Sequence, residues 1–202
     1  MNKHENFWIT TIFRGVLAIL IGSGILIIPD LARTILFLPF ALAFVILSLA
    51  VYGIADSMLV FATSFFTSLH PAKAALRLQS AFGIAIGVLF CSILFDRIHL
   101  EWFLYLIALQ ALATSAAEFW IARHTAREHG SRWCYAAASV ALICSATYIV
   151  AASVAPATLS PHQIALLAYA YLAVFGVAQT LMAIRMLSFE LRAARPAQLQ
   201  GQ

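Results

Sequence analysis

The sequence predicts an all-α integral membrane protein, with six transmembrane helices arranged as three repeated helical hairpins. Of its 202 residues, 63% are hydrophobic and only 10% are charged, whereas a soluble domain is about half apolar and about a quarter charged. The apolar residues form runs that reach the length of about 20 residues needed to span a bilayer. A short motif that ends in a polar residue occurs three times, with that residue at positions 56, 118 and 179.

The first span is predicted over 7–28, and Pro29 is expected to close it because proline disfavours a continuing helix. The next apolar run, from 35 to 66, is too long for one simple span. It must therefore tilt, kink near Pro39 or extend beyond the bilayer, and we place the second span at 35–62.

Four further apolar runs follow, separated by short polar connections. The corresponding spans are predicted at 74–95, 102–122, 133–154 and 163–187. Six spans with their connections leave no room for a separate soluble domain. We therefore predict one transmembrane domain over 1–195, and a disordered tail over 196–202.

Glycines recur within these apolar runs. Gly15 and Gly22 lie in the first span, while Gly83 and Gly87 form a GxxxG pair in the third. Small residues allow the backbones of two helices to approach closely in lipid. These four glycines are therefore predicted to be helix-packing positions.

The basic residues are distributed unequally between the two sides of the predicted bundle. Arg33 and Arg97 fall on one side, and the other ten basic residues fall on the side of the N-terminus: Lys3, Arg14, Lys73, Arg77, Arg123, Arg127, Arg132, Arg185, Arg192 and Arg195. The positive-inside rule then places both termini in the cytoplasm. Because these residues are scattered between apolar runs, nucleic acid is not expected as a partner.

Cysteine and nucleophile patterns indicate neither a metal site nor an enzyme. Cys91, Cys134 and Cys144 lie in apolar runs without paired spacing, which favours neither a disulfide framework nor zinc. Gly22-Ser23-Gly24 lacks the flanking residues of a nucleophile elbow, and no glycine-rich phosphate loop is present. We expect no catalytic residues, no bound metal and no cofactor.

One arginine and two acids interrupt the apolar runs. Arg14, Asp56 and Glu118 all fall in the half of their spans predicted to be cytoplasmic. Since a charge at the bilayer centre costs on the order of 2.5–3.5 kcal/mol, such residues usually pair, reach the interface or line a wet cavity. We predict an ion pair of Arg14 with Asp56, Glu118 or both. The alternative is that Arg14 extends to lipid phosphates while the acids lie at the interface.

The repeated motif consists of Tyr52–Asp56, Thr114–Glu118 and Phe175–Gln179. Its last residue is preceded by alanine each time and lies late in an even-numbered span. This predicts three hairpins built on one plan and adds Gln179 to the predicted polar cluster of Arg14, Asp56 and Glu118. The alternative is that any chain of alternating direction places polar residues near the same interface.

The first hairpin leads from Arg14–Gly22, with the sequence Arg-Gly-Val-Leu-Ala-Ile-Leu-Ile-Gly, through Pro29 to Tyr52–Asp56. With these residues the chain resembles the HdeD family of bacterial membrane proteins over nearly its whole length. The family has an Asp-Gly pair late in the second helix, whereas here Asp56 is followed by Ser57. The resemblance implies a six-helix protein of the bacterial inner membrane, linked to acid-stress resistance and with no established reaction.

Together these features predict a non-enzymatic protein that acts in acid or envelope stress as a structural or interaction protein. Its expected partners are the lipid bilayer and either a second copy of the chain or other membrane proteins. The alternative is a transporter of protons or small solutes that uses intramembrane carboxylates. A transporter would need polar side chains along both halves of the bundle, whereas a structural role needs only a local contact between Arg14 and an acid.

Overall fold

The computed structural model describes residues 7–35, 38–66, 70–95, 97, 99, 102–124, 131–154 and 161–199. Apart from residues 95, 97 and 99, the described residues form helices, and none of them forms a strand. The helices are α1 (Phe7–Ile35), α2 (Leu38–Phe66), α3 (His70–Leu94), α4 (Trp102–His124), α5 (Ser131–Val154) and α6 (Pro161–Leu199). The predicted all-helical fold is confirmed.

Each helix contains a segment that is long and apolar enough to cross a membrane. The six segments are Trp8–Ile27, Ala43–Phe65, Ala72–Leu94, Trp102–Arg123, Arg132–Val154 and Ala165–Ser188. A helix satisfies its backbone hydrogen bonds internally, which is the requirement for crossing a hydrocarbon layer. The chain therefore has the character of a multi-pass membrane protein.

All six helices extend beyond their predicted bounds at one end or both, among them α1, α3 and α6. Helix α1 continues through Pro29 to Ile35 instead of ending at residue 28, because proline removes one backbone hydrogen bond but its φ angle suits a helix. Helix α3 already begins at His70, since Pro71 occupies a first-turn position where no N–H partner is needed. Helix α6 continues to Leu199, beyond the predicted end of the last span at 187, whereas residues 200–202 lie outside the described residues and the disordered tail stays a prediction.

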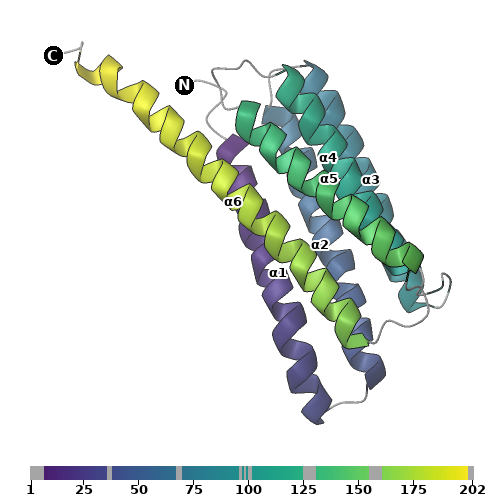
Figure 1. The fold of residues 1–202 in the computed structure, drawn as a ribbon. Coiled ribbons are helices and arrows are strands. Elements are labelled where there is room, and N and C mark those ends of the chain that lie inside the picture. The colour runs from purple at the N-terminus through teal and green to yellow at the C-terminus, as the bar shows by residue number, and fades with distance from the viewer. Residues whose placement is uncertain are drawn as a thin grey trace.

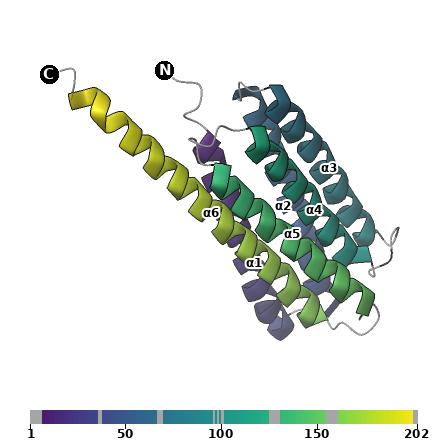
Figure 2. The same cartoon turned by 45° about the horizontal axis from the view of Figure 1, so that its top comes forward.

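Successive helices run in opposite directions, and α1 lies along α6 (Figures 1 and 2). Each helix packs against the helices before and after it in the chain, and α6 packs against α1, so the six helices form a ring of neighbours. Around this ring, closely packed pairs alternate with loosely packed pairs. The closely packed pairs are α1–α6, α2–α3 and α4–α5, and the looser pairs are α1–α2, α3–α4 and α5–α6. The closest packing thus joins helices of different predicted hairpins.

Small residues lie where the closely packed helices meet. A Cβ atom on Gly15 of α1 would come 2.8 Å from the backbone oxygen of Gly176 of α6. A Cβ on Gly87 of α3 would lie 3.2 Å from the backbone oxygen of Ala50 of α2. Of the other two predicted packing glycines, Gly22 faces Leu172 and Gly83 faces Ser57. All four therefore lie at close helix pairs, where they permit the approach.

Candidate functional site

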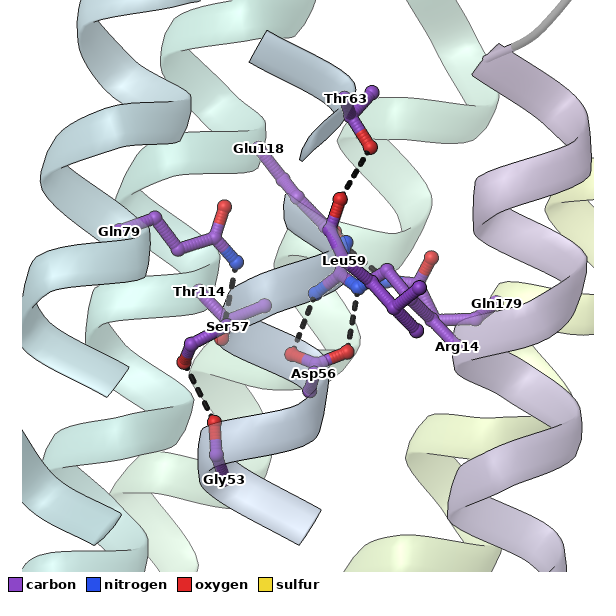
Figure 3. A network of polar contacts seen from close by, with 10 residues as sticks. All are labelled: Arg14, Gly53, Asp56, Ser57, Leu59, Thr63, Gln79, Thr114, Glu118 and Gln179. Atoms are coloured by element: carbon purple, nitrogen blue, oxygen red, sulfur yellow. Dashed lines mark hydrogen bonds and ion pairs between the residues drawn. The ribbon is translucent and has the colours of Figure 1, made fainter. Parts of the chain in front are cut away.

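A bidentate ion pair lies inside the bundle between α1 and α2 (Figure 3). Arg14 donates from Nε to Oδ1 of Asp56 at 2.6 Å and from Nη2 to Oδ2 at 3.1 Å. Arg14 is 6% exposed and Asp56 is 2% exposed. The guanidinium also lies 5.8 Å from the centre of the Phe175 ring on α6. Arg14 thus points into the bundle towards Asp56, as one of the two predicted arrangements requires.

Helix length and direction explain why these two residues meet. Arg14 lies seven residues after the start of α1, and Asp56 lies ten residues before the end of α2. At about 1.5 Å per residue, the two positions lie about 10 Å and about 15 Å from the same end of an antiparallel helix pair. The residues therefore lie at similar heights, in the half of the bundle nearer to the start of α1.

A second polar pair joins α4 to α6. The side-chain amide nitrogen of Gln179 donates a hydrogen bond to Oε1 of Glu118. Glu118 is 5% exposed and Gln179 is fully buried. Arg14, Asp56, Glu118 and Gln179, the residues predicted as a polar cluster, thus lie in the interior as two bonded pairs, and Glu118 interacts electrostatically with both Arg14 and Asp56.

A third polar contact joins α3 to α4. Gln79 donates from Nε2 to the hydroxyl oxygen of Thr114 at 3.4 Å, and both residues are buried. Gln79 was not among the predicted site residues, although a glutamine within an apolar run is a usable signal for a buried polar contact. Thr114 is the first residue of the second repeated motif.

Each of these three polar contacts joins two of the closely packed helix pairs. The pair Arg14–Asp56 links α1–α6 to α2–α3, Gln79–Thr114 links α2–α3 to α4–α5, and Glu118–Gln179 links α4–α5 to α1–α6. Each polar contact therefore crosses from one closely packed helix pair to another. We call these contacts the polar links.

Several buried polar atoms of the bundle have no hydrogen-bond partner within the described residues. They are Oε2 of Glu118, Oε1 of Gln179, the hydroxyl of Tyr52, Oε1 of Gln79, Oε1 of Gln110 and Oγ of Ser64. Most buried polar atoms in proteins are hydrogen-bonded, and an exception requires a physical explanation. The remaining carboxylate oxygen of Glu118 is the exception with the largest consequence, because it belongs to an ionisable group.

Apolar side chains occupy the other half of the bundle. The main buried cluster includes Ile25 of α1, Val45 of α2 and Leu172 of α6. Within it, the rings of Phe90 and Phe103 meet edge to face, with their centres 5.6 Å apart. Buried acids occur among the described residues only at Asp56 and Glu118. The polar links thus end against an apolar layer.

The half with the polar links ends in cations that lie over aromatic rings. Arg77 of α3 lies 5.8 Å from the ring centre of Phe65, and Arg185 of α6 lies 5.3 Å from that of Trp133. Both arginines are exposed, unlike Arg14. Such pairs suit a membrane interface, where one end of a side chain is apolar and the other is wet.

The three cysteines are free thiols. Cys134 is buried, while Cys91 and Cys144 are partly buried. Within the part of the chain that the structure describes, no three His, Cys, Asp or Glu side chains gather as metal ligands would.

The arrangement can hold helices together and can compensate buried charge. A scan against protein families and searches of curated proteins and of solved structures found no match to this chain.

Proposed function

We propose that this chain is a non-enzymatic protein of the HdeD type in a bacterial inner membrane, with both termini in the cytoplasm, and that it acts in acid or envelope stress as a structural or interaction protein. Residues 14–22 and 52–56 support the family proposal, as described above. The excess of basic residues on the side of the N-terminus supports the orientation.

The observation that carries the structural role is the buried Arg14–Asp56 pair. A guanidinium and a carboxylate that bond through two N–H groups satisfy one another in a fixed geometry. With the other two polar links, this pair holds three closely packed helix pairs in one arrangement. A bundle fixed in this way suits a rigid membrane scaffold better than a protein that must alternate between two open states.

We also infer that the chain consists of three hairpins built on one plan. Close and loose packing alternate around the bundle, as expected when each hairpin packs most tightly against the next. The second residue of each repeated motif lies against the closely packed neighbour of its own helix. Gly53 faces Gly83, Ser115 donates to the backbone oxygen of Ala138, and Gly176 faces Gly15.

The transporter alternative has one favourable observation, the unpartnered Glu118 Oε2 atom. Transport across the whole bundle would also require polar side chains in the half filled by Ile25, Val45 and Leu172. The buried side chains of that half are mainly apolar, and the hydroxyl of Tyr148 there already donates to the backbone oxygen of Leu167, so a structural role accounts for the geometry better.

Proteoliposomes distinguish these two functions. The purified protein is reconstituted with a pH-sensitive dye inside the vesicles, and a pH gradient is imposed. We expect the gradient to decay at the rate of protein-free vesicles. Faster decay with the wild type that is lost in Glu118→Gln would contradict the structural role and support proton transport.

The stress role is tested in the host. A strain that lacks the gene is compared with the parent strain for survival after acid and envelope stress. We expect lower survival, which wild type and Arg77→Leu restore and Arg14→Leu does not. Equal survival of the two strains under both stresses would remove the stress proposal.

A further inference from the structure

The electrostatic balance of the bundle interior is incomplete when both acids are ionised. The positive charge of Arg14 is matched by Asp56 through two hydrogen bonds. An ionised Glu118 would then add one negative charge in a position that is 5% exposed. A buried charge without full compensation is strongly unfavourable, and a carboxylate in such a place takes up a proton instead.

Charged and titratable side chains surround Glu118 on several packed helices. Whether a negative charge on Glu118 is balanced depends on all of them. The groups that interact with it electrostatically or by hydrogen bonding are Arg14 of α1, Tyr52 and Asp56 of α2, Cys134 of α5 and Gln179 of α6. On its own helix, Thr114 is occupied by Gln79 of α3. Arg14 is the one cation in this set, and it is already bound to Asp56.

The hydrogen bonds of Glu118 fit a neutral carboxylic acid. Its Oε1 atom accepts from the amide of Gln179, as a carbonyl oxygen does, whereas its buried Oε2 atom has no partner within the described residues. A protonated carboxyl group is one acceptor plus one O–H donor. Two further atoms that can accept a hydrogen bond, Gln179 Oε1 and the Tyr52 hydroxyl oxygen, are also buried and unpartnered.

We propose that Glu118 is a proton-binding site, which holds one proton on Oε2 in the folded protein at neutral pH. The only bond that forms is the O–H bond, and it converts the carboxylate into a neutral acid. The proposal goes beyond the structural function and does not require proton transport. A proton suits the site better than a metal cation, because hard cations take more oxygen ligands than the unpartnered oxygens of Glu118, Gln179 and Tyr52 supply.

The matched variants are Glu118→Gln and Asp56→Asn, because each replaces a buried acid by an amide of nearly the same shape. Glutamine mimics a neutral Glu118, so its thermal midpoint is expected to equal that of the wild type. Asparagine leaves Arg14 without its counter-charge, so its midpoint is expected to fall clearly. An equal fall in both variants would overturn the proposal, because it would show that Glu118 also acts as an anion.

Infrared spectroscopy of the protein in lipid nanodiscs tests the proton directly. The wild type at neutral pH is expected to show the C=O stretch of a protonated carboxyl group, which Glu118→Gln loses and the control variant Arg77→Leu retains. Glu118→Asp, which is expected to shift this band, serves if the glutamine variant does not fold. No such band in the wild type, or a band unaltered by either Glu118 variant, would overturn the proposal.

A metal cation is distinguished by the choice of salt. The thermal midpoint of the wild type is expected to be the same in sodium, potassium and choline chloride at equal ionic strength. A rise specific to sodium or potassium that disappears in Glu118→Gln would show that a metal ion occupies the site and would overturn the assignment of a proton.

Discussion

Arg14 and Asp56 lie on two helices that pack loosely, yet their side chains form the most complete polar contact of the interior. Two N–H groups face two carboxylate oxygens, at 2.6 and 3.1 Å. Helix α1 packs closely on α6, and α2 packs closely on α3. The ion pair therefore joins the helix pairs α1–α6 and α2–α3, which are themselves packed through small residues. The ion pair and the small residues can be tested separately by substitution.

Replacement of Arg14 by leucine is expected to destabilise the folded protein by about 3–5 kcal/mol, since Asp56 would remain as an unpaired buried charge. The double variant Arg14→Leu with Asp56→Leu is expected to recover most of this loss, because it removes both charges. Thermal unfolding in detergent, followed by the amount of monodisperse protein, measures the effect.

Arg77→Leu is the matched control for the Arg14→Leu and Asp56→Leu variants. Arg77 is exposed and contacts the Phe65 ring, so its loss is expected to cost about 0.5–1 kcal/mol. If Arg14→Leu unfolds at the same temperature as the wild type, the Arg14–Asp56 pair does not stabilise the bundle.

Gly15→Ala is expected to destabilise the protein by about 1–3 kcal/mol, the usual cost of overpacking. The added Cβ would lie 2.8 Å from the backbone oxygen of Gly176, which cannot rotate away as a side chain can. Gly53→Ala is the control, because its nearest contact would be at an ordinary 3.7 Å. Thermal midpoints of the two variants measure the difference, and equal midpoints would contradict close packing of α1 against α6.

Two serine hydroxyls form hydrogen bonds between α4 and α5, one donated from each helix. Ser115 of α4 donates to the backbone oxygen of Ala138 at 2.8 Å, and Ser145 of α5 donates to that of Ala108 at 2.9 Å. Each change to alanine is expected to cost about 0.6 kcal/mol, the average for a polar contact between membrane helices. The double variant should show the sum, measured by chemical unfolding in mixed micelles.

Ser139→Ala is the control for this pair. Ser139 is exposed and donates to Tyr135 of its own helix, so its removal leaves the contact between α4 and α5 unchanged. A larger effect for Ser139→Ala than for Ser115→Ala would show that the hydroxyl contacts between the helices are not stabilising.

Some features of the site could be predicted from single residues. Arg14 within an apolar run required a partner, and the acids at 56 and 118 were the candidates because their helices alternate in direction. The choice between them could not be made, since it depends on helix rotation and side-chain reach. The structure assigns the hydrogen-bonded pair to Asp56 and gives Glu118 the amide of Gln179.

Helix boundaries, too, could be predicted only in part from single residues. Pro29 suggested that the first helix stops near 29, and the last span was predicted to end at 187, but α1 and α6 continue to Ile35 and Leu199. The residues beyond each expected stop favour helix well enough for the preceding turns to propagate. The sequence therefore predicted the ends of the apolar segments better than the ends of the helices.

The sequence by itself determined that the chain forms six apolar helices, because length and hydropathy are properties of each segment alone. It also determined that the charge of Arg14, within the first predicted span at 7–28, needed compensation. Only the tertiary structure decided that α1 packs closely on α6, that Asp56 binds Arg14, and that Glu118 keeps one oxygen unpartnered. These outcomes depend on how six helices rotate and pack at once, and no single segment contains that information.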